Sequence, residues 1–145
     1  KQQLQIASGQ PLSHHVLNAV QRHHSIECLI NAEDPENNFM PSPGTIDLYY
    51  APGGRGVRID SHAYAGYPIP PNYDSMIAKL IVHASTREQA IARMRRALGE
   101  YMITGIKTTI PLQLEIMQNK DFIAGKYDTG FLERMLAERS IPPKK

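Results

Sequence analysis

Apolar residues recur at every second position in the first part of the chain, which is the pattern of half-buried β-strands. In HSIECLINAED the apolar residues Ile26, Cys28 and Ile30 fall on one face, and the run ends at an Asp-Pro dipeptide that favours a turn. A polar, proline-rich loop, PENNFMPSPG, separates this strand from a second predicted strand, TIDLYYA, at residues 45–51.

A third strand is predicted in GVRIDSHAY, which follows a turn at Pro52-Gly53-Gly54. Alternation places two sets of side chains on its opposite faces, with Val57, Ile59 and Ser61 on one and Arg58, Asp60 and His62 on the other. Because a short glycine-containing segment joins the second and third strands, the pattern predicts that they pair as a β-hairpin.

The period changes in the second half of the chain. The apolar run SMIAKLIVHA, at residues 75–84, is typical of a buried strand, and the spacing of Thr86 and Gln89 matches a capping box at the start of a helix. The core stripe of that helix recurs at steps of three and four residues, through Ile91, Met94, Leu98 and Tyr101. Gly105 is predicted to end the helix.

The remaining pattern completes the predicted fold class. A short strand after Gly105, a helix around residues 111–118, a turn at Asn119-Lys120 and a final amphipathic helix in TGFLERMLAER are expected. Phe131, Leu132 and Met135 are predicted to face inward in the last helix. Because strands come first and helices later, the chain is predicted to be α+β, with a mainly antiparallel β-sheet flanked by helices.

Composition leaves several classes of protein without support. The chain has 145 residues, one domain's length, and a formal net charge of +2, which gives no electrostatic argument for nucleic acid. Its single cysteine, Cys28, lies in an apolar run, which indicates a buried reduced thiol and favours a cytoplasmic protein. No apolar run approaches the roughly 18 residues of a membrane span, and the polar opening is unlike a signal peptide.

Most of the candidate chemistry has a structural interpretation. Glu33 and Asp34 are adjacent carboxylates, but AEDP is a common way to begin a turn. The histidines show no HxxxH spacing and there is no CxxC, so no metal site is predicted. Three arginines of the predicted helix are expected to form a solvated face or a protein contact rather than a nucleic-acid surface. They are Arg87, Arg93 and Arg96.

Arg58 is the candidate that stands out from this background. It lies in mid-strand beside the glycine-rich corner PGGRG, which lacks the Lys-Ser/Thr ending of a phosphate-binding P-loop. A planar guanidinium held on a strand can bind a carboxylate, a bicarbonate ion or a carbonyl oxygen through paired hydrogen bonds. The alternative is a solvated charge on the polar face of the strand.

Long ungapped stretches of the chain resemble one family. These are IECLINAEDPENNFMPSPGTI, APGGRGVRIDSHAYAGYPIPPNYDSMIAKLIVHASTREQAIARMRRAL, GIKTTIPLQLEIM and GKYDTGFLE. In this order they resemble the C-terminal region of biotin carboxylase, above all of the bacterial acetyl-CoA carboxylase type. The opening QLQIASGQPL resembles the segment that ends the ATP-grasp region. The resemblance implies an ATP-grasp tail and connection at residues 1–22, the biotin carboxylase C-terminal domain at 23–139 and a tail at 140–145.

The resemblance implies a function and a site. The parent enzyme would be an ATP-dependent ligase that carboxylates biotin on its carrier protein with bicarbonate, the first step of acetyl-CoA carboxylase in fatty acid synthesis. In the family the arginine of GVR binds bicarbonate and the ureido oxygen of biotin, and it corresponds to Arg58. A fixed guanidinium there would stabilise the charge that develops on that oxygen. The implied partners are a second copy, met through residues 83–96, the biotin carboxyl carrier protein and a carboxyltransferase.

The resemblance also limits what the chain is expected to do alone. The family's metal-binding carboxylates, general-base glutamate, second catalytic arginine and most phosphate contacts precede QLQIASGQ. The chain alone is therefore expected to be inactive and to bind none of biotin, ATP and Mg²⁺. Leu29 stands where the family usually has arginine and Thr104 where some members have aspartate, which would alter local contacts.

Three alternatives to this assignment stay open. The chain could be a non-catalytic module for dimerisation or for docking the biotin carrier. It could belong to the biotin carboxylase part of pyruvate carboxylase or of another acyl-CoA carboxylase. It could belong to an ATP-grasp carboxylase of purine synthesis, although the stretch YAGYPIPPNYDSMIAKL argues against that.

Overall fold

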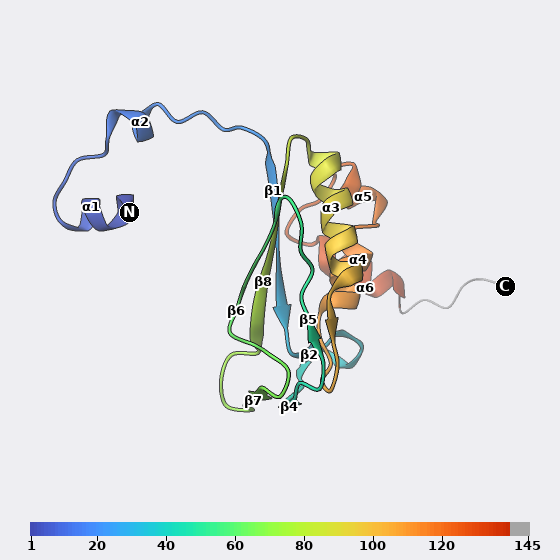
Figure 1. The fold of residues 1–145 in the computed structure, drawn as a ribbon. Coiled ribbons are helices and arrows are strands. Elements are labelled where there is room, and N and C mark those ends of the chain that lie inside the picture. The colour runs from blue at the N-terminus through green and yellow to red at the C-terminus, as the bar shows by residue number, and fades with distance from the viewer. Residues whose placement is uncertain (140–145) are drawn as a thin grey trace.

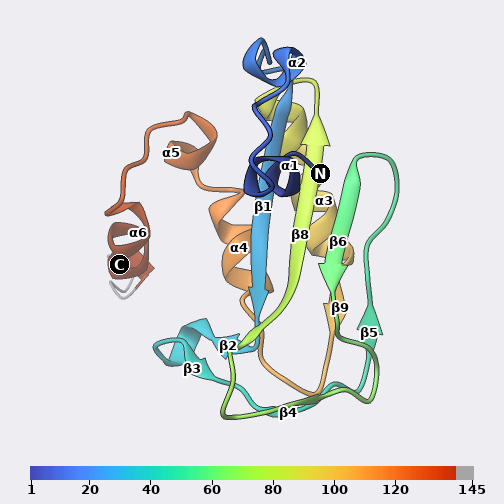
Figure 2. The same ribbon diagram turned by 90° about the vertical axis from the view of Figure 1, so that its left-hand side faces the viewer.

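The structure, a computed structural model, describes residues 1–139 and is built around an antiparallel three-stranded sheet (Figures 1 and 2). In spatial order its strands are β1 (His24–Asn31), β8 (Met76–Ala84) and β6 (Val57–Ser61). β8 is the central strand, and its Leu80 lies opposite Cys28 of β1 and Ile59 of β6. These three side chains therefore point to the same face of the sheet.

The hydrophobic core lies between that face and the helix α3 (Arg87–Glu100). The buried side chains that the sheet and α3 contribute include Cys28, Ile30, Leu80, Val82, Ala90, Met94, Ala97 and Leu98. α3 begins after Thr86, whose hydroxyl oxygen accepts a hydrogen bond from the backbone N–H of Gln89 (3.3 Å), as the capping-box spacing predicts. α4 (Ile110–Ile116) lies on the same side of the sheet as α3 (Figure 1).

Short two-stranded ribbons close the end of the sheet opposite the start of α3. The pairs are β2 (Glu33–Asp34) with β3 (Met40–Pro41), β4 (Gly44–Thr45) with β7 (Pro68–Ile69), and β5 (Tyr49–Tyr50) with β9 (Met102–Ile103). A 3-10 turn, η1 (Pro35–Asn37), lies between β2 and β3. The predicted strand at 45–51 is thus two strands of two residues each, with a break between them.

The other helices are short and lie on either side of the sheet. α5 (Lys120–Ile123) and α6 (Phe131–Arg139) lie on the side of α3, while α1 (Gln2–Ala7) and α2 (His14–Leu17) extend away on the other side (Figure 1). In α6, Met135 is buried and Phe131 and Leu132 are half-buried. The α+β class with a mainly antiparallel sheet is confirmed.

The predicted hairpin between the second and third strands is wrong. β5 pairs with β9, and β6 pairs with β8, so the two strands beside the glycine corner belong to different sheets. A long-range contact explains the separation, because the hydroxyl groups of Tyr49 and Tyr101 are hydrogen-bonded at 2.7 Å. That contact holds β5 at the C-terminal end of α3.

The end of α3 also differs from the prediction. The helix stops at Glu100, and Tyr101 takes an extended conformation that leads directly into β9. Gly105 comes later and serves the turn after β9, with φ at 91° and its Cα packed so closely against Thr45 that an added Cβ would lie 2.2 Å from the Thr45 carbonyl oxygen. The turn predicted at Asn119 is in fact the start of α5, which the Asn119 side chain caps.

Candidate functional site

One face of the three-stranded sheet is turned away from α3, α4, α5 and α6, and α1 and α2 stand apart from it on that side (Figures 1 and 2). We call it the open face. Its residues alternate with the core residues along each strand and are exposed or half-buried, namely Ser25, Glu27, Leu29, Arg58, Asp60, Lys79, Ile81 and His83. In register, Arg58 lies opposite Ile81, and Asp60 lies opposite Lys79.

Arg58 projects from β6 on this open face, as strand alternation predicts. Its side chain is 70% exposed, and its Nη2 donates to Oδ2 of Asp60 at 3.2 Å. The two residues are separated by one position on the same strand, so they share a face. Pairing through a single terminal nitrogen leaves the other N–H groups of the guanidinium available to a ligand.

The glycine-rich corner before Arg58 is firmly attached to the rest of the domain. Gly54 and Gly56 have φ values of 100° and 74°, in the region that favours glycine. The backbone N–H of His83 donates to the Gly56 carbonyl oxygen at 2.9 Å, which ties the corner to β8. A Cβ added at Gly56 would lie 2.5 Å from the His83 carbonyl oxygen, so this close approach requires glycine.

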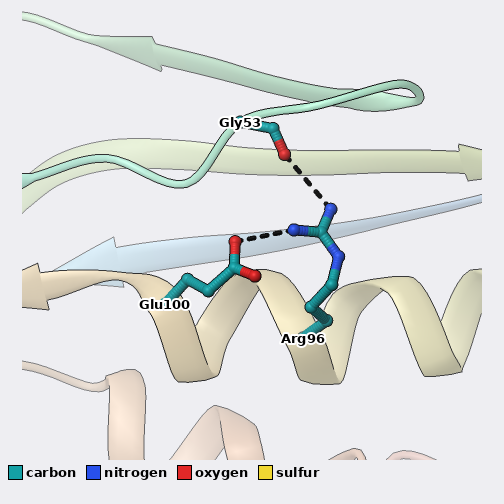
Figure 3. Close-up of polar contacts among 3 residues, drawn as sticks. All are labelled: Gly53, Arg96 and Glu100. Atoms are coloured by element: carbon teal, nitrogen blue, oxygen red, sulfur yellow. Dashed lines mark hydrogen bonds and ion pairs between the residues drawn. The ribbon is translucent and has the colours of Figure 1, made fainter.

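Arg96 ties the same corner to α3. Its guanidinium donates to the Gly53 carbonyl oxygen at 3.1 Å and to the Glu100 carboxylate at 2.6 Å (Figure 3). The strand that carries Arg58 is thus fixed from both sides, through β8 and through α3.

The other two arginines of α3 also bind backbone carbonyl groups. Arg93 donates to the His83 carbonyl oxygen, and Arg87 donates to the Ile123 carbonyl oxygen at 2.6 Å while its guanidinium lies over the Phe122 ring. The prediction left open a solvated face or a protein contact, and these two half-buried side chains join α3 to its neighbours within the domain. Their partners lie 10 and 36 positions away in the chain, and no local pattern signals them.

Two hollows lie at opposite ends of the sheet. The smaller, about 340 Å³, is lined in part by Asp60, His62, Met76 and Lys79, next to the Arg58–Asp60 pair. The larger, about 670 Å³, lies beside the start of α3. We call it the basic cavity, because its lining includes His23, Arg55, His83 and Arg93. The His23 and His83 rings meet edge to face there, with centroids 5.1 Å apart.

The remaining candidates have structural roles. Oδ1 of Asp34 accepts a hydrogen bond from the backbone N–H of Glu36 at 3.1 Å, which confirms the turn interpretation of that residue. Glu33 accepts hydrogen bonds from the side chains of Asn31 and Ser75. Within residues 1–139 no group of three or more potential metal ligands gathers. In the same residues, no helix has the length and apolar content needed to cross a membrane.

Cys28 is buried in the core, with 2% of its surface exposed. Burial, together with the negative charge of Glu27, raises the pKa of its thiol to about 12. The prediction of a buried thiol is confirmed, and the group is chemically unreactive at neutral pH.

The domain is thus an antiparallel sheet with helices on one face and Arg58 exposed on the other. Residues 27–134 match the family described as the biotin carboxylase C-terminal domain, and the chain belongs to that family. This confirms the resemblance found in the sequence.

Relatives of the chain are carboxylases of more than one kind. It is 54% identical over 133 residues to biotin carboxylase 1 of Bacillus subtilis (strain 168), covering 92% of this chain and 30% of that relative. It is 51% identical over 133 residues to a pyruvate carboxylase polypeptide of Methanothermobacter thermautotrophicus, covering 92% of this chain and 27% of that one. The chain thus spans about 30% of the length of the relatives it matches.

Solved structures agree in fold. The biotin carboxylase domain of the 2-oxoglutarate carboxylase from Hydrogenobacter thermophilus superposes with a TM-score of 0.88 at 48% identity, over 97% of this chain and 31% of that one. That structure is described as a dimer in complex with MgADP, ADP and bicarbonate. The biotin carboxylase of Campylobacter jejuni, solved as a β,γ-ATP complex, superposes with a TM-score of 0.84 at 48% identity, over 92% of this chain and 29% of that one.

Proposed function

We propose that the chain is the C-terminal part of a longer ATP-dependent biotin carboxylase of the acetyl-CoA carboxylase type, and that Arg58 is its contribution to the active site. The observation that carries this proposal is the presentation of Arg58. Its guanidinium is exposed on the open face, on a strand that is fixed through β8 and α3.

Arg58 would act by electrostatic stabilisation. In the proposed reaction, ATP phosphorylates bicarbonate to carboxyphosphate and leaves as ADP, and carboxyphosphate then breaks down to carbon dioxide and phosphate. A base of the longer enzyme removes the proton from the ureido nitrogen of biotin, and that nitrogen attacks the carbon dioxide. Loss of that proton places negative charge on the ureido oxygen. A guanidinium fixed in advance stabilises this charge without reorganising during the reaction. Bicarbonate and ureido oxygen both suit the planar donor geometry of arginine.

The cofactors and partners follow from the same proposal. ATP and Mg²⁺ would bind to the longer enzyme, which the MgADP and bicarbonate of the Hydrogenobacter structure support. A second copy of the chain would complete a homodimer, which the dimer of that structure supports, and we propose residues 83–96 as the contact. The biotin carboxyl carrier protein and a carboxyltransferase complete the proposed set of partners. The one cysteine, buried and reduced, fits the proposed cytoplasmic setting.

The final acceptor of the carboxyl group separates the proposal from its closest alternatives. Relatives that carry the names biotin carboxylase, pyruvate carboxylase and 2-oxoglutarate carboxylase are 54%, 51% and 52% identical to the chain. They support the carboxylation of biotin as a shared first step. We propose the acetyl-CoA carboxylase type on the form of the RIDSHAYAGY stretch.

Substitution of Arg58 in the full-length carboxylase that carries this chain tests the proposal. Arg58→Ala is expected to lower the rate of biotin carboxylation by about 100-fold, the order seen when one preorganised donor is removed. Arg58→Lys should recover little of this, because an ammonium group keeps the charge and loses the planar donors. Steady-state kinetics measures the rates. Thermal unfolding measures stability, and the melting temperature should hardly change because the Arg58 side chain is exposed.

Lys126→Ala is the matched control, because it removes one exposed cation from a different part of the domain. Activity of Arg58→Ala within a few-fold of the wild type would contradict the catalytic role. It would favour the alternative of a non-catalytic dimerisation or docking module.

A further inference from the structure

The only salt bridge of Arg58 within residues 1–139 is to the carboxylate two positions along the same strand. Asp60 accepts from one terminal nitrogen of Arg58 at 3.2 Å, and the two side chains are 70% and 52% exposed. An arginine side chain on an open surface has many rotamers. A carboxylate on the same face of the strand restricts it to those that keep the guanidinium near Asp60.

Asp60 also faces a second cation. Lys79 of β8 is its direct partner in register, and side chains at such positions in an antiparallel pair lie within contact distance. Both residues line the 340 Å³ hollow of the open face. Asp60 is thus paired with Arg58 and lies opposite Lys79 on the neighbouring strand, at the edge of a hollow, and the three side chains together carry a charge of +1.

We infer that Asp60 is a positioning residue for Arg58, and the inference rests on the proposed function. By holding one terminal nitrogen, Asp60 would orient the guanidinium so that its remaining N–H groups face outward to bicarbonate or to the ureido oxygen. The negative charge of Asp60 has a second effect, because it opposes the binding of an anion beside it. Asp60 therefore favours the transition state through orientation while weakening the binding of bicarbonate in the ground state.

This combination gives Asp60→Asn a distinctive kinetic effect in the full-length carboxylase. The substitution keeps the size of the side chain and removes its charge. The value of kcat should fall about two- to five-fold, as suits an exposed ion pair, while the KM for bicarbonate stays the same or falls. Asp60→Glu, which restores the carboxylate, should recover most of kcat. A merely structural role would instead raise KM and lower the melting temperature together.

A double-mutant cycle shows through which residue Asp60 acts. In an Arg58→Ala background, Asp60→Asn should have no further effect on kcat, because the group that it positions is gone. In a Lys79→Met background, the effect of Asp60→Asn should persist.

The possible outcomes separate this inference from the proposed function. If Arg58→Ala alone has little effect, the proposed function fails. If Arg58→Ala is strongly impaired but Asp60→Asn is neutral, raises the KM for bicarbonate, or adds fully to Arg58→Ala, only the inference is overturned. Loss of the Asp60→Asn effect in the Lys79→Met background would likewise overturn it, because Asp60 would then act through the lysine.

Discussion

Burial controls the chemistry of Cys28, which shows how a single residue can link the core to pH. The thiol lies on the inner face of β1, and its pKa of about 12 means that the folded protein keeps it protonated well above the range where an exposed thiol ionises. Between the pKa of the unfolded thiol and that of the folded thiol, only the folded state keeps the proton, so the free energy of unfolding falls as the pH rises. The stabilisation is therefore complete below about pH 8.5 and is lost as the pH rises toward 12.

We expect the free energy of unfolding of the wild type to fall faster with pH than that of Cys28→Ala between about pH 9 and 11. The difference in slope should approach about 1.4 kcal/mol per pH unit, the value for one proton bound only by the folded state. Urea unfolding of both proteins across this range measures it. Tyrosines and lysines titrate in the same range, but they are common to both proteins and cancel in the comparison. Parallel curves would show that the folded thiol ionises normally.

The glycine-rich corner between β5 and β6 is held in place by β8 and α3. Gly56 has a φ of 74° and lies against the His83 carbonyl oxygen, whereas Gly53 has nothing within 4 Å of an added Cβ and an ordinary φ. We expect Gly56→Ala to lower the free energy of unfolding by about 2 kcal/mol, from the left-handed backbone and the close contact together. Gly53→Ala is the matched control and should stay within about 0.5 kcal/mol.

Thermal and urea unfolding of the two glycine variants test whether the corner is rigid. Because Arg96 binds the carbonyl oxygen of Gly53 and needs no particular side chain there, Gly53→Ala leaves that contact in place. Equal losses of stability in the two variants would mean that the corner moves as a flexible loop. Equal and negligible changes would lead to the same conclusion.

Sequence patterns predicted elements well where the signal was local. Period-2 alternation placed the core faces of β1 and β6, and the Thr86 cap and the apolar stripe placed α3. Pairing between distant segments was not predictable in this way. β5 pairs with β9 and is held there by the contact between Tyr49 and Tyr101. The short glycine segment after β5 does not signal this pairing.

In the candidate site, too, the features set by local spacing were predictable and those set by distant contacts were not. Alternation placed Arg58 and Asp60 on one face of a strand, because that relation depends only on their spacing. The attachment of their strand depends on Arg96 and His83, which lie 38 and 25 positions after Arg58 in the chain, and only the structure reveals it. The role given to Arg58 came from the resemblance to the family, since a single arginine has no motif of its own.

At the scale of the whole molecule, the two surfaces proposed to meet a partner lie in different places. The open face presents Arg58 with Leu29 and Ile81 nearby, a mixture of charge and apolar surface that suits contact with another part of an enzyme. The basic cavity lies at the start of α3, within the region proposed for the contact with a second copy. A dimer formed there would leave the Arg58–Asp60 pair of each copy accessible, since Asp60 lines the other hollow, at the opposite end of the sheet.

We therefore expect the 16.3 kDa chain to sediment with twice that mass at tens of micromolar. A two-fold symmetric contact contains every residue twice, so one substitution changes it in two places. Arg55→Glu reverses a charge in the basic cavity and should raise the dissociation constant of the dimer about tenfold or more. Lys126→Glu makes the same change of charge at an exposed position outside the contact and should leave the dimer intact. Sedimentation velocity over a concentration series measures all three proteins. Only monomer in the wild type, or equal weakening by both substitutions, would remove the basic cavity from the contact.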